Sequence, residues 1–355
     1  MSALAVVLGA LALVVVALVV YAALETRRHA WPREPDAWVT AKAADGWPLL
    51  VARYEGAAPK KALPVVLCHG LGANATNLDA IPEYSLARYL KSRGYDTFVL
   101  ELRGAGRNVG AAPIPWRKRW VHTFDDFVRL DAPAALKAVR EATGADQALW
   151  VGHSMGGMIA YALAGSPEGA ALRGVVAIAS PAFFRAPPGT RHLLGLNVLL
   201  RGRLRIRTLA RLFAPLAAYV PGKRFGSVRS NFDPKLLRQV LHNVLDDMSG
   251  ALIRQFARWS KDDVFDSNDG RVDYRAGLAK ATTPFLLVAG ASDDLAPPRG
   301  VERVHGLLGS SDKTYRLLSK ATGAQMDYGH GDLVFGRDAP GEVFPLVADW
   351  LDLHA

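Results

Sequence analysis

The chain has 355 residues, of which 50% are hydrophobic and 21% are charged, so its composition excludes a disordered chain and predicts a sizeable core. Its single cysteine, Cys68, excludes an intramolecular disulfide and a cluster of thiolate metal ligands. The formal net charge of +10 predicts attraction to an anionic partner, either nucleic acid or a phospholipid surface.

The N-terminal segment, residues 2–24, carries no charged side chain and consists almost entirely of Ala, Leu and Val. As a helix it is roughly 33 Å long, enough to cross a hydrocarbon core of about 30 Å. It has no clear basic start or small-residue cleavage site of the kind that marks a secretory signal peptide. We therefore expect a transmembrane anchor over residues 1–24, followed by a juxtamembrane stem over residues 25–37.

The charges that flank this segment predict its orientation. Only the α-amino group precedes it, whereas Arg27, Arg28, Arg33 and Lys42 follow it closely. Positive residues tend to remain in the cytoplasm, so we expect a single-pass protein whose folded domain is cytoplasmic. A domain on the periplasmic or extracellular side stays open as the alternative.

From about residue 38 onward, short β-branched and aliphatic runs alternate with segments of helical periodicity, which is typical of a sheet built from βα units. The predicted strands span residues 48–54, 65–68, 97–100, 148–152, 175–179, 285–289 and 314–318, and the predicted helices span residues 86–93, 124–142 and 155–164. Zinc-ligand spacing and aromatic RNA-binding motifs are absent from the sequence, so we expect no nucleic-acid partner.

The alternation stops after Pro181 and resumes near residue 282, which predicts a helical cap over residues 183–275 with no obvious strand. The stretch 173–229 has no acidic residue, and leucines separate its many basic ones. In a chain with a bilayer anchor, this pattern favours contact with a membrane surface, and a solvated basic face over a lid is the alternative. The basic residues are Arg173, Arg185, Arg191, Arg201, Arg203, Arg205, Arg207, Arg211, Lys223, Arg224 and Arg229.

Residues Gly152-His153-Ser154-Met155-Gly156 fit the pattern G-x-S-x-G and lie between a predicted strand and a predicted helix. A serine on such a sharp turn has a strained backbone, and flanking glycines remove side chains that would collide. Ser154 is therefore the candidate nucleophile. A purely structural glycine turn is the alternative.

An activated serine needs a base and preorganised hydrogen-bond donors for the oxyanion. Upstream, His69-Gly70-Leu71-Gly72 follows the predicted strand 65–68, and this turn can aim the N–H of Leu71 at the site beside the N–H of Met155. We expect His69 to hold this loop rather than to transfer protons.

Downstream, Asp293 and Asp294 follow the predicted strand 285–289, and His330 lies in a glycine-flanked loop after the last predicted strand. Ser154, Asp293 and His330 therefore occur in the order nucleophile, acid and base. His153 is expected to point away from the pocket, and the patterns around His122, His192, His242 and His305 are typical of surface or helix positions.

With these motifs, the chain from about residue 38 to its C-terminus resembles the α/β-hydrolase superfamily. The resemblance implies a mostly parallel central sheet flanked by helices, with the nucleophile, acid and histidine after the fifth, seventh and eighth strands and a cap after the sixth. It implies core segments at residues 38–182 and 276–355, and Gly290-x-x-Asp293 matches the family's acid loop better than Asp294 does. Residues 101–106, Glu-Leu-Arg-Gly-Ala-Gly, are similar to the family's D-x-R-G-x-G turn, with Glu101 in place of Asp.

These features predict a serine hydrolase that cleaves carboxylic esters through an acyl-enzyme. His330 acts as base, Asp293 orients it, Ser154 attacks, and the N–H groups of Leu71 and Met155 stabilise the oxyanion. Support of the elbow and loop is assigned to Gly152, Gly156, His69 and Gly70. The scheme needs no cofactor.

The apolar anchor and the cap residues Phe183 and Phe184 favour lipid-like or other hydrophobic acyl esters as substrates. A membrane-bound acyltransferase with the same triad and a non-catalytic binding protein of the same fold remain open. No metal site is expected, because no two histidines have H-x-x-x-H spacing. The acidic pairs Asp246-Asp247 and Asp262-Asp263 are expected at solvated helix ends.

Overall fold

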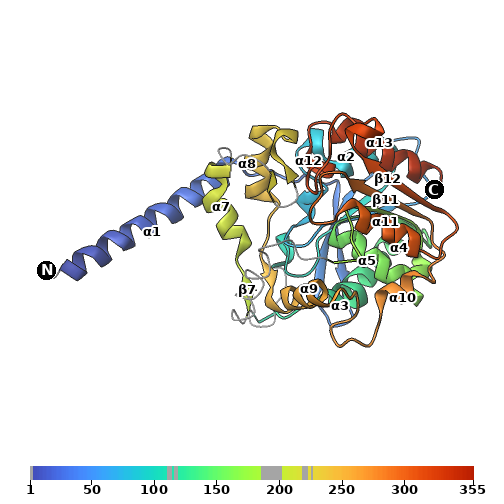
Figure 1. Cartoon of the computed structure of the whole chain (residues 1–355), viewed down its shortest axis with the longest axis horizontal. Coiled ribbons are helices and arrows are strands. Elements are labelled where there is room, and N and C mark those ends of the chain that lie inside the picture. Colours follow the sequence, from blue (N-terminus) through green and yellow to red (C-terminus); the bar gives the residue numbers. More distant parts are fainter. Residues whose placement is uncertain (1–2, 110–113, 116–118, 185–201, 218–222, 225–226) are drawn as a thin grey trace.

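The computed structural model describes residues 3–109, 114–115, 119–184, 202–217, 223–224 and 227–355. An eight-stranded sheet with the order β1-β2-β4-β3-β5-β6-β11-β12 runs through the rounded body of the molecule (Figure 1). Strand β2 pairs antiparallel with β1 and β4, and all other neighbours are parallel. The strands are β1 (Ala37–Lys42), β2 (Pro48–Tyr54), β3 (Val65–Cys68), β4 (Thr97–Leu100), β5 (Ala148–His153), β6 (Leu172–Ile178), β11 (Phe285–Gly290) and β12 (Lys313–Leu318).

All seven predicted strands are present, and their ends differ from the predicted ones by only a few residues. The inner strands β3, β4, β5 and β11 are buried at every position, which explains their continuous apolar runs. Strand β1 was not predicted. It lies at the edge of the sheet with mostly half-exposed side chains, so it lacks both an apolar run and a clear alternation.

Helices flank the sheet, as the sequence predicted. Helices α2 (Leu86–Ser92) and α5 (Met155–Ala164) confirm two of the three predictions. The third, residues 124–142, is a succession of α3 (Phe124–Asp126), a π-helical turn (Phe127–Asp131) and α4 (Ala132–Thr143). The C-terminal part adds α11 (Pro298–Leu307), α12 (Asp332–Phe335) and α13 (Ala339–Asp352).

Between β6 and β11 the described residues form mainly helices, namely α7 (Ile206–Ala217), α8 (Pro234–Asn243), α9 (Gly250–Asp262) and α10 (Tyr274–Leu278). The expectation of no strand in this region was wrong, because β7 (Arg203–Leu204) pairs with β10 (Met248–Ser249) and β8 (Lys223–Arg224) with β9 (Ser227–Val228). Two-residue strands are too short to produce a periodic pattern. Arg185, Arg191 and Arg201 of the predicted basic segment, and His192, lie outside the described residues.

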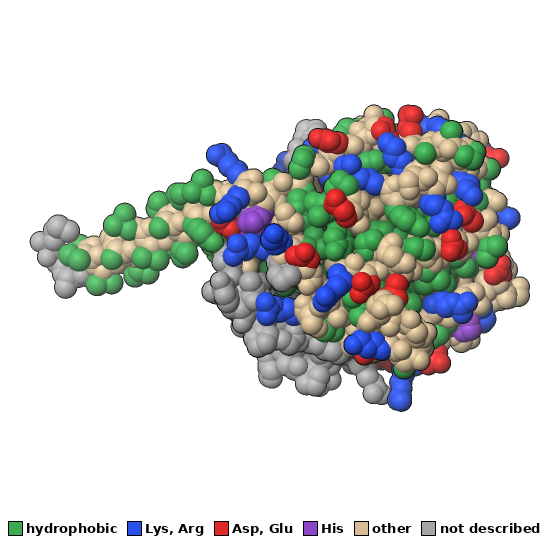
Figure 2. All heavy atoms as spheres, turned by 90° about the horizontal axis from the view of Figure 1, so that it is seen from above, with side chains coloured by type: hydrophobic (Ala, Val, Ile, Leu, Met, Phe, Trp, Pro, Cys, Tyr) green, Lys and Arg blue, Asp and Glu red, His purple; other side chains and the backbone are tan. Residues whose placement is uncertain are grey.

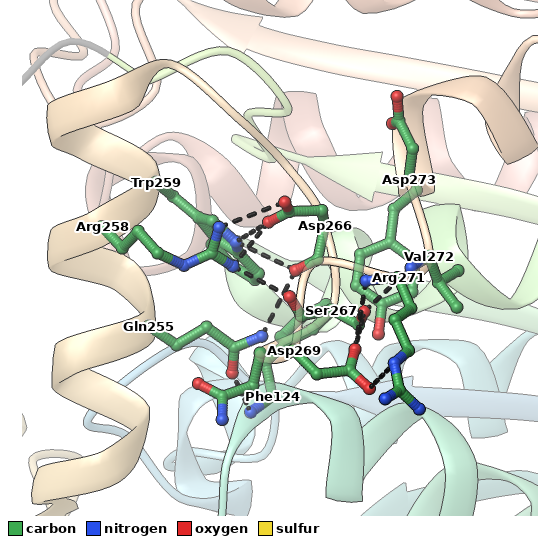
Figure 3. Close-up of polar contacts among 12 residues, drawn as sticks. Phe124, Gln255, Arg258, Trp259, Asp266, Ser267, Asp269, Arg271, Val272 and Asp273 are labelled. Atoms are coloured by element: carbon green, nitrogen blue, oxygen red, sulfur yellow. Dashed lines mark hydrogen bonds and ion pairs between the residues drawn. The ribbon is translucent and has the colours of Figure 1, made fainter.

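Helix α9 is joined to the core by a network of polar contacts (Figure 3). Gln255 accepts a hydrogen bond from the backbone N–H of Phe124 (2.9 Å), and Arg258 pairs with Asp266 (2.6 Å). Beside this network Phe184 stacks on Trp259, with ring centroids 5.5 Å apart. This part of the predicted cap is therefore packed against the body of the protein through aromatic and polar contacts.

Helix α1 (Ala3–Arg28) projects from the body and exposes its apolar side chains along its length (Figures 1 and 2). Its 26 residues extend about 39 Å, so it is long and apolar enough to cross a membrane. A signal sequence near an N-terminus has the same properties. The helix ends at Arg28, a few residues beyond the predicted anchor.

The segment after α1 is fixed to the core rather than free of it. The guanidinium group of Arg33 is buried, and it pairs with the carboxylates of Asp79 (2.8 Å) and Glu101 (3.1 Å). The main-chain N–H of Trp31 donates to the side chain of Asn243 at the end of α8 (3.1 Å). The predicted stem therefore contributes a buried charge to the protein interior.

Several polar residues expected at the surface are buried. Asp246 is 1% exposed and pairs with Arg207, and Asp247 pairs with Arg203, so this acidic pair is not a solvated helix end. The imidazole of His122 is also buried rather than at the surface. Two arginines of the predicted basic face therefore have carboxylate partners within the protein.

Candidate active site

Ser154 lies at the turn between β5 and α5. Its backbone has φ 54° and ψ −119°, a conformation that non-glycine residues rarely adopt. The turn is held by the N–H of Ser154, which donates to the carbonyl of Ile178 in β6 (2.8 Å), and by the N–H of Gly157, which donates to the carbonyl of Ser154 (3.0 Å). The strained elbow predicted from G-x-S-x-G is present.

The glycines of the motif allow this turn to pack closely. A Cβ atom on Gly152 would collide with the backbone of Gly156, and a Cβ atom on Gly156 would collide with the carbonyl of Cys68 in β3. Both positions therefore require glycine for a steric reason. The close approach of α5 to the end of β3 brings the loop after β3 beside Ser154.

His330 and Asp293 are in direct contact. Nδ1 of His330 donates to Oδ2 of Asp293 (2.8 Å), while the other oxygen, Oδ1, accepts the N–H groups of Leu295 and Ala296 (2.8 Å each). Asp293 is fully buried, and the side chain of His330 is 11% exposed. Of the two candidate acids, Asp293 is the one hydrogen-bonded to His330, as the sequence favoured.

The loop that carries His330 is fixed by Asp332, which is completely buried at the start of α12. Oδ2 of Asp332 accepts the N–H of Gly329 (2.8 Å) and the amide of Asn231 (2.8 Å). Its carboxylate also accepts the N–H of Val228 in β9 (3.1 Å). Burial raises the pKa of Asp332. The histidine loop is therefore held by residues from the region between β6 and β11, which sequence reasoning did not identify.

His153 connects the elbow to the histidine loop. Its ring lies 4.9 Å from the ring of His330, and its Nε2 is 3.1 Å from the backbone carbonyl of His330. Its Nδ1 is 3.0 Å from the side-chain oxygen of Asn77. Burial lowers the pKa of His153 to about 3, so the ring is neutral and donates its one N–H to only one of these oxygens. His153 therefore lies beside His330.

The turn after β3 lies next to Ser154, since a Cβ atom on Gly70 would be 3.1 Å from the Cβ of Ser154. His69 holds this turn. Its Nδ1 donates to the carbonyl of Gly70 (2.9 Å), and its Nε2 accepts the N–H of Leu102 (3.2 Å). Burial lowers the pKa of His69 to about 4, which keeps the ring neutral. Asn77, which accepts the N–H of Gly70 (3.1 Å), gives further support that was not predicted.

The backbone N–H groups of Leu71 and Met155 have no hydrogen-bond acceptor among the residues that the structure describes. Met155 is the first residue of α5, where backbone N–H groups lack partners within the helix and favour negative charge. The hydroxyl of Ser154 also has no hydrogen bond to a described residue. No group with metal-ligand spacing in the described part of the chain includes Ser154, Asp293 or His330.

The turn at residues 101–106 shows what the glutamate does in place of aspartate. One oxygen of Glu101 accepts the N–H of Arg107 (2.9 Å), and the other pairs with Arg33 (3.1 Å). Arg103 pairs with the buried Asp131 (2.7 Å). The longer side chain at position 101 thus keeps a loop hydrogen bond while it also binds the segment that follows α1.

Comparison with known proteins identifies the family of this fold. The α/β hydrolase fold family matches residues 64–321. Human lipase member K is 26% identical over 331 residues, which cover 81% of this chain and 78% of that protein. Human gastric triacylglycerol lipase is 39% identical over a shorter match of 103 residues, which covers 28% of this chain and 26% of that protein.

Two solved structures show the same fold. A soluble variant of the monoglyceride lipase of Saccharomyces cerevisiae has a TM-score of 0.61 at 20% identity, over 92% of this chain and 99% of that one. An esterase from Thermogutta terrifontis has a TM-score of 0.59 at 19% identity, over 90% of this chain and 99% of that one. The chain belongs to the α/β hydrolase fold family and is a hydrolase enzyme, similar to lipases and esterases.

Proposed function

We propose that this protein is a serine hydrolase that cleaves carboxylic esters with Ser154 as nucleophile, His330 as general base and Asp293 as the acid that orients it. The observation that carries the proposal is the hydrogen bond from His330 to the buried Asp293, beside a serine in a strained turn. A buried carboxylate bonded to Nδ1 leaves Nε2 free to accept a proton and stabilises the imidazolium that forms.

In the proposed mechanism, Nε2 of His330 takes the proton of Ser154 Oγ while Oγ attacks the ester carbonyl carbon. The N–H groups of Leu71 and Met155 donate to the oxyanion, each contributing about 3 kcal/mol to the lowering of the barrier. The imidazolium then gives its proton to the leaving alcohol, which departs from the acyl-enzyme. A water molecule, deprotonated by His330, attacks the acyl carbon and regenerates Ser154.

We propose hydrophobic acyl esters, such as lipids, as the substrates. The similarity to proteins named as lipases supports this substrate class, and so does the apolar helix α1, which would hold the enzyme at a lipid surface. The contiguous apolar surface of α1 is far larger than soluble proteins expose, which supports its insertion in a bilayer. The basic residues that follow the apolar part of α1, beginning with Arg27 and Arg28 in its last turn, favour a cytoplasmic domain.

The test of the catalytic proposal is fluorophosphonate labelling of the full chain in detergent micelles. Labelling should be lost in Ser154→Ala and retained in the control Ser166→Ala, whose hydroxyl lies in a loop and bonds Glu168. Turnover of p-nitrophenyl esters of increasing chain length should then rise toward medium or long acyl chains. Labelling that survives in Ser154→Ala would refute the nucleophile, and a preference for acetate would refute the substrate class.

The test of the topology uses the fact that Cys68 is the only cysteine and is buried. A cysteine introduced by Ala355→Cys at the exposed C-terminus should react with a membrane-impermeant maleimide only after the membrane is opened. Alkaline carbonate should leave the protein in the membrane fraction. Labelling in intact cells would place the domain outside the cytoplasm, and release by carbonate would refute the anchor.

A further inference from the structure

Three ionisable side chains from distant parts of the chain meet where α1 joins the body. Glu25 lies in the last turns of α1, His29 follows its end, and His242 belongs to α8. The side chain of Asn243 joins the two segments, because its Nδ2 donates to the carbonyl of His29 (2.7 Å) across about 200 residues of sequence. Acidic, basic and histidine side chains gather visibly at the base of the protruding helix (Figure 2).

The three side chains have the spacing of a metal-ligand set. Oε2 of Glu25 is 3.3 Å from Nε2 of His29, and the rings of His29 and His242 stack with centroids 5.1 Å apart. One ligand atom from each residue lies within 4.8 Å of the others. Ligands about 2.0–2.1 Å from a tetrahedral zinc ion are about 3.4 Å from one another, a separation that Glu25 and His29 already have and that His242 would reach by moving toward them.

Several polar atoms of these side chains are buried without a hydrogen-bond partner. Glu25 is 8% exposed and His242 is 1% exposed. Oε2 of Glu25, Nε2 of His29 and both ring nitrogens of His242 have no hydrogen bond within the described structure. A buried imidazole that bonds to nothing through either nitrogen is unfavourable, and a bound ion is one of the few arrangements that satisfies it.

We propose that Glu25, His29 and His242 bind a zinc ion that links the end of α1 to helix α8. Two imidazole nitrogens and one carboxylate oxygen suit zinc, whereas calcium and magnesium prefer oxygen ligands alone. Three protein ligands leave a fourth position for water. The site is separate from Ser154 and does not depend on the proposed ester hydrolysis. The sequence has no H-x-x-x-H spacing that would indicate this site, since its ligands come from two distant segments.

Two positive charges near the site provide a second test, in which a substitution should strengthen zinc binding rather than weaken it. Nη1 of Arg28 is 3.8 Å from Oε1 of Glu25, and its side chain is 76% exposed. Arg211 donates from its guanidinium to the backbone carbonyl of His242 (3.2 Å). Both cations repel a bound zinc ion. Removal of the exposed cation by Arg28→Ala should therefore strengthen zinc binding, whereas loss of a ligand should weaken it.

The experiment is titration of the full chain in detergent micelles with zinc chloride, in competition with a chromophoric chelator. The wild type should bind one zinc ion per chain. His242→Ala and His29→Ala should bind at least about 100-fold more weakly, because even loss of a partner outside the ligand set costs 10- to 100-fold. His305→Ala, a substitution in α11, should bind like the wild type. Cobalt in place of zinc should give the visible spectrum of a tetrahedral site in the wild type and in His305→Ala, and should not do so in the ligand variants.

If His242→Ala misfolds, His29→Ala and Glu25→Gln still test the site. Circular dichroism verifies the fold of each variant. Zinc should also raise the melting temperature of the wild type and leave that of His29→Ala unchanged. Absence of zinc binding at micromolar concentration would overturn the proposal and leave a cluster of ionisable groups only. Equal binding by the wild type and all three ligand variants would overturn it as well.

Discussion

The loops around Ser154 and the junction at the end of α1 both depend on buried ionisable side chains, but they are assembled differently. At the candidate active site, Ser154, Asp293 and His330 each follow a parallel strand of the same sheet. At the junction, Arg33 reaches Asp79 and Glu101. His29 and Trp31, which precede Arg33, contact Asn243 of α8, which lies more than half the chain length away in the sequence.

The difference shows which contacts between buried groups can be predicted from a single sequence. The carboxyl ends of parallel strands meet at one edge of a sheet, so three short motifs at strand ends suffice to predict that their side chains converge. No such rule relates the residues after α1 to α8, because their contacts depend on how the region between β6 and β11 packs. Substitutions in the two regions test this contrast.

Substitution of the candidate base should have the largest effect. His330→Ala should lower kcat by about 10⁶-fold, as removal of one member of a catalytic unit does, because Ser154 would lose its proton acceptor. Ester hydrolysis in micelles measures it, with His305→Ala as the matched control. Activity within tenfold of the wild type would show that the side chains at these strand ends do not act together as a catalytic unit.

The two neighbouring acids differ in contact with the base, so they should differ in effect. Asp293→Asn should lower kcat by about 10⁴-fold, because the amide favours the wrong tautomer of His330. Asp294→Asn should change kcat by less than about tenfold, since Asp293 is the residue bonded to His330. A larger loss in the Asp294 variant would reverse the assignment of the acid.

Most of the sheet and the elbow could be predicted because they depend on local patterns. The buried strands give apolar runs, and Gly152 is required by a steric contact with Gly156 inside the same motif. Strand β1 could not be predicted, since an edge strand with half-exposed side chains gives no clear period. The two-residue strands β7 and β10 are likewise stabilised by packing and not by their own sequence.

The supporting residues of the candidate site were missed for a related reason. For His153 the sequence predicted only that it points away from the pocket, and its contact with the loop of His330 was not foreseen. Asn77, Asp332 and Asn231 belong to no motif, and each acts through hydrogen bonds that only the folded chain creates. The G-x-S-x-G motif contains His153 as a variable position, so the sequence gives no signal for its contact.

The buried arginine tests the junction. Arg33→Ala should reduce the free energy of unfolding by about 3–5 kcal/mol, because it leaves Asp79 and Glu101 buried without their partner. Chemical unfolding in micelles measures it. Lys137→Ala is the control, since it breaks an exposed pair with Glu141 and should cost about 0.5 kcal/mol or less. Equal effects of the two substitutions would mean that the segment after α1 is not fixed to the core.

Acid should destabilise the core because its buried histidines bind protons more readily in the unfolded chain. The loss of stability per histidine should be smaller than the loss caused by Arg33→Ala. Burial lowers the pKa of His69 and His122 to about 4 and that of His153 to about 3. Protonation therefore favours the unfolded chain. Stability is complete above the unfolded pKa of about 6.5 and falls as the pH drops toward 4, by roughly 2–3 kcal/mol per histidine.

His122 isolates one of these contributions because it lies outside the candidate active site. His122→Gln should lower the number of protons taken up on unfolding by about one between pH 6.5 and 4. Above pH 7 the difference in unfolding free energy between variant and wild type should be constant. Carboxyl groups titrate in both proteins and cancel in the comparison, so an unchanged slope in His122→Gln would show that this imidazole is already protonated in the folded state. The pH dependence of the unfolding free energy would then give no signal of this buried histidine, just as the sequence gives none.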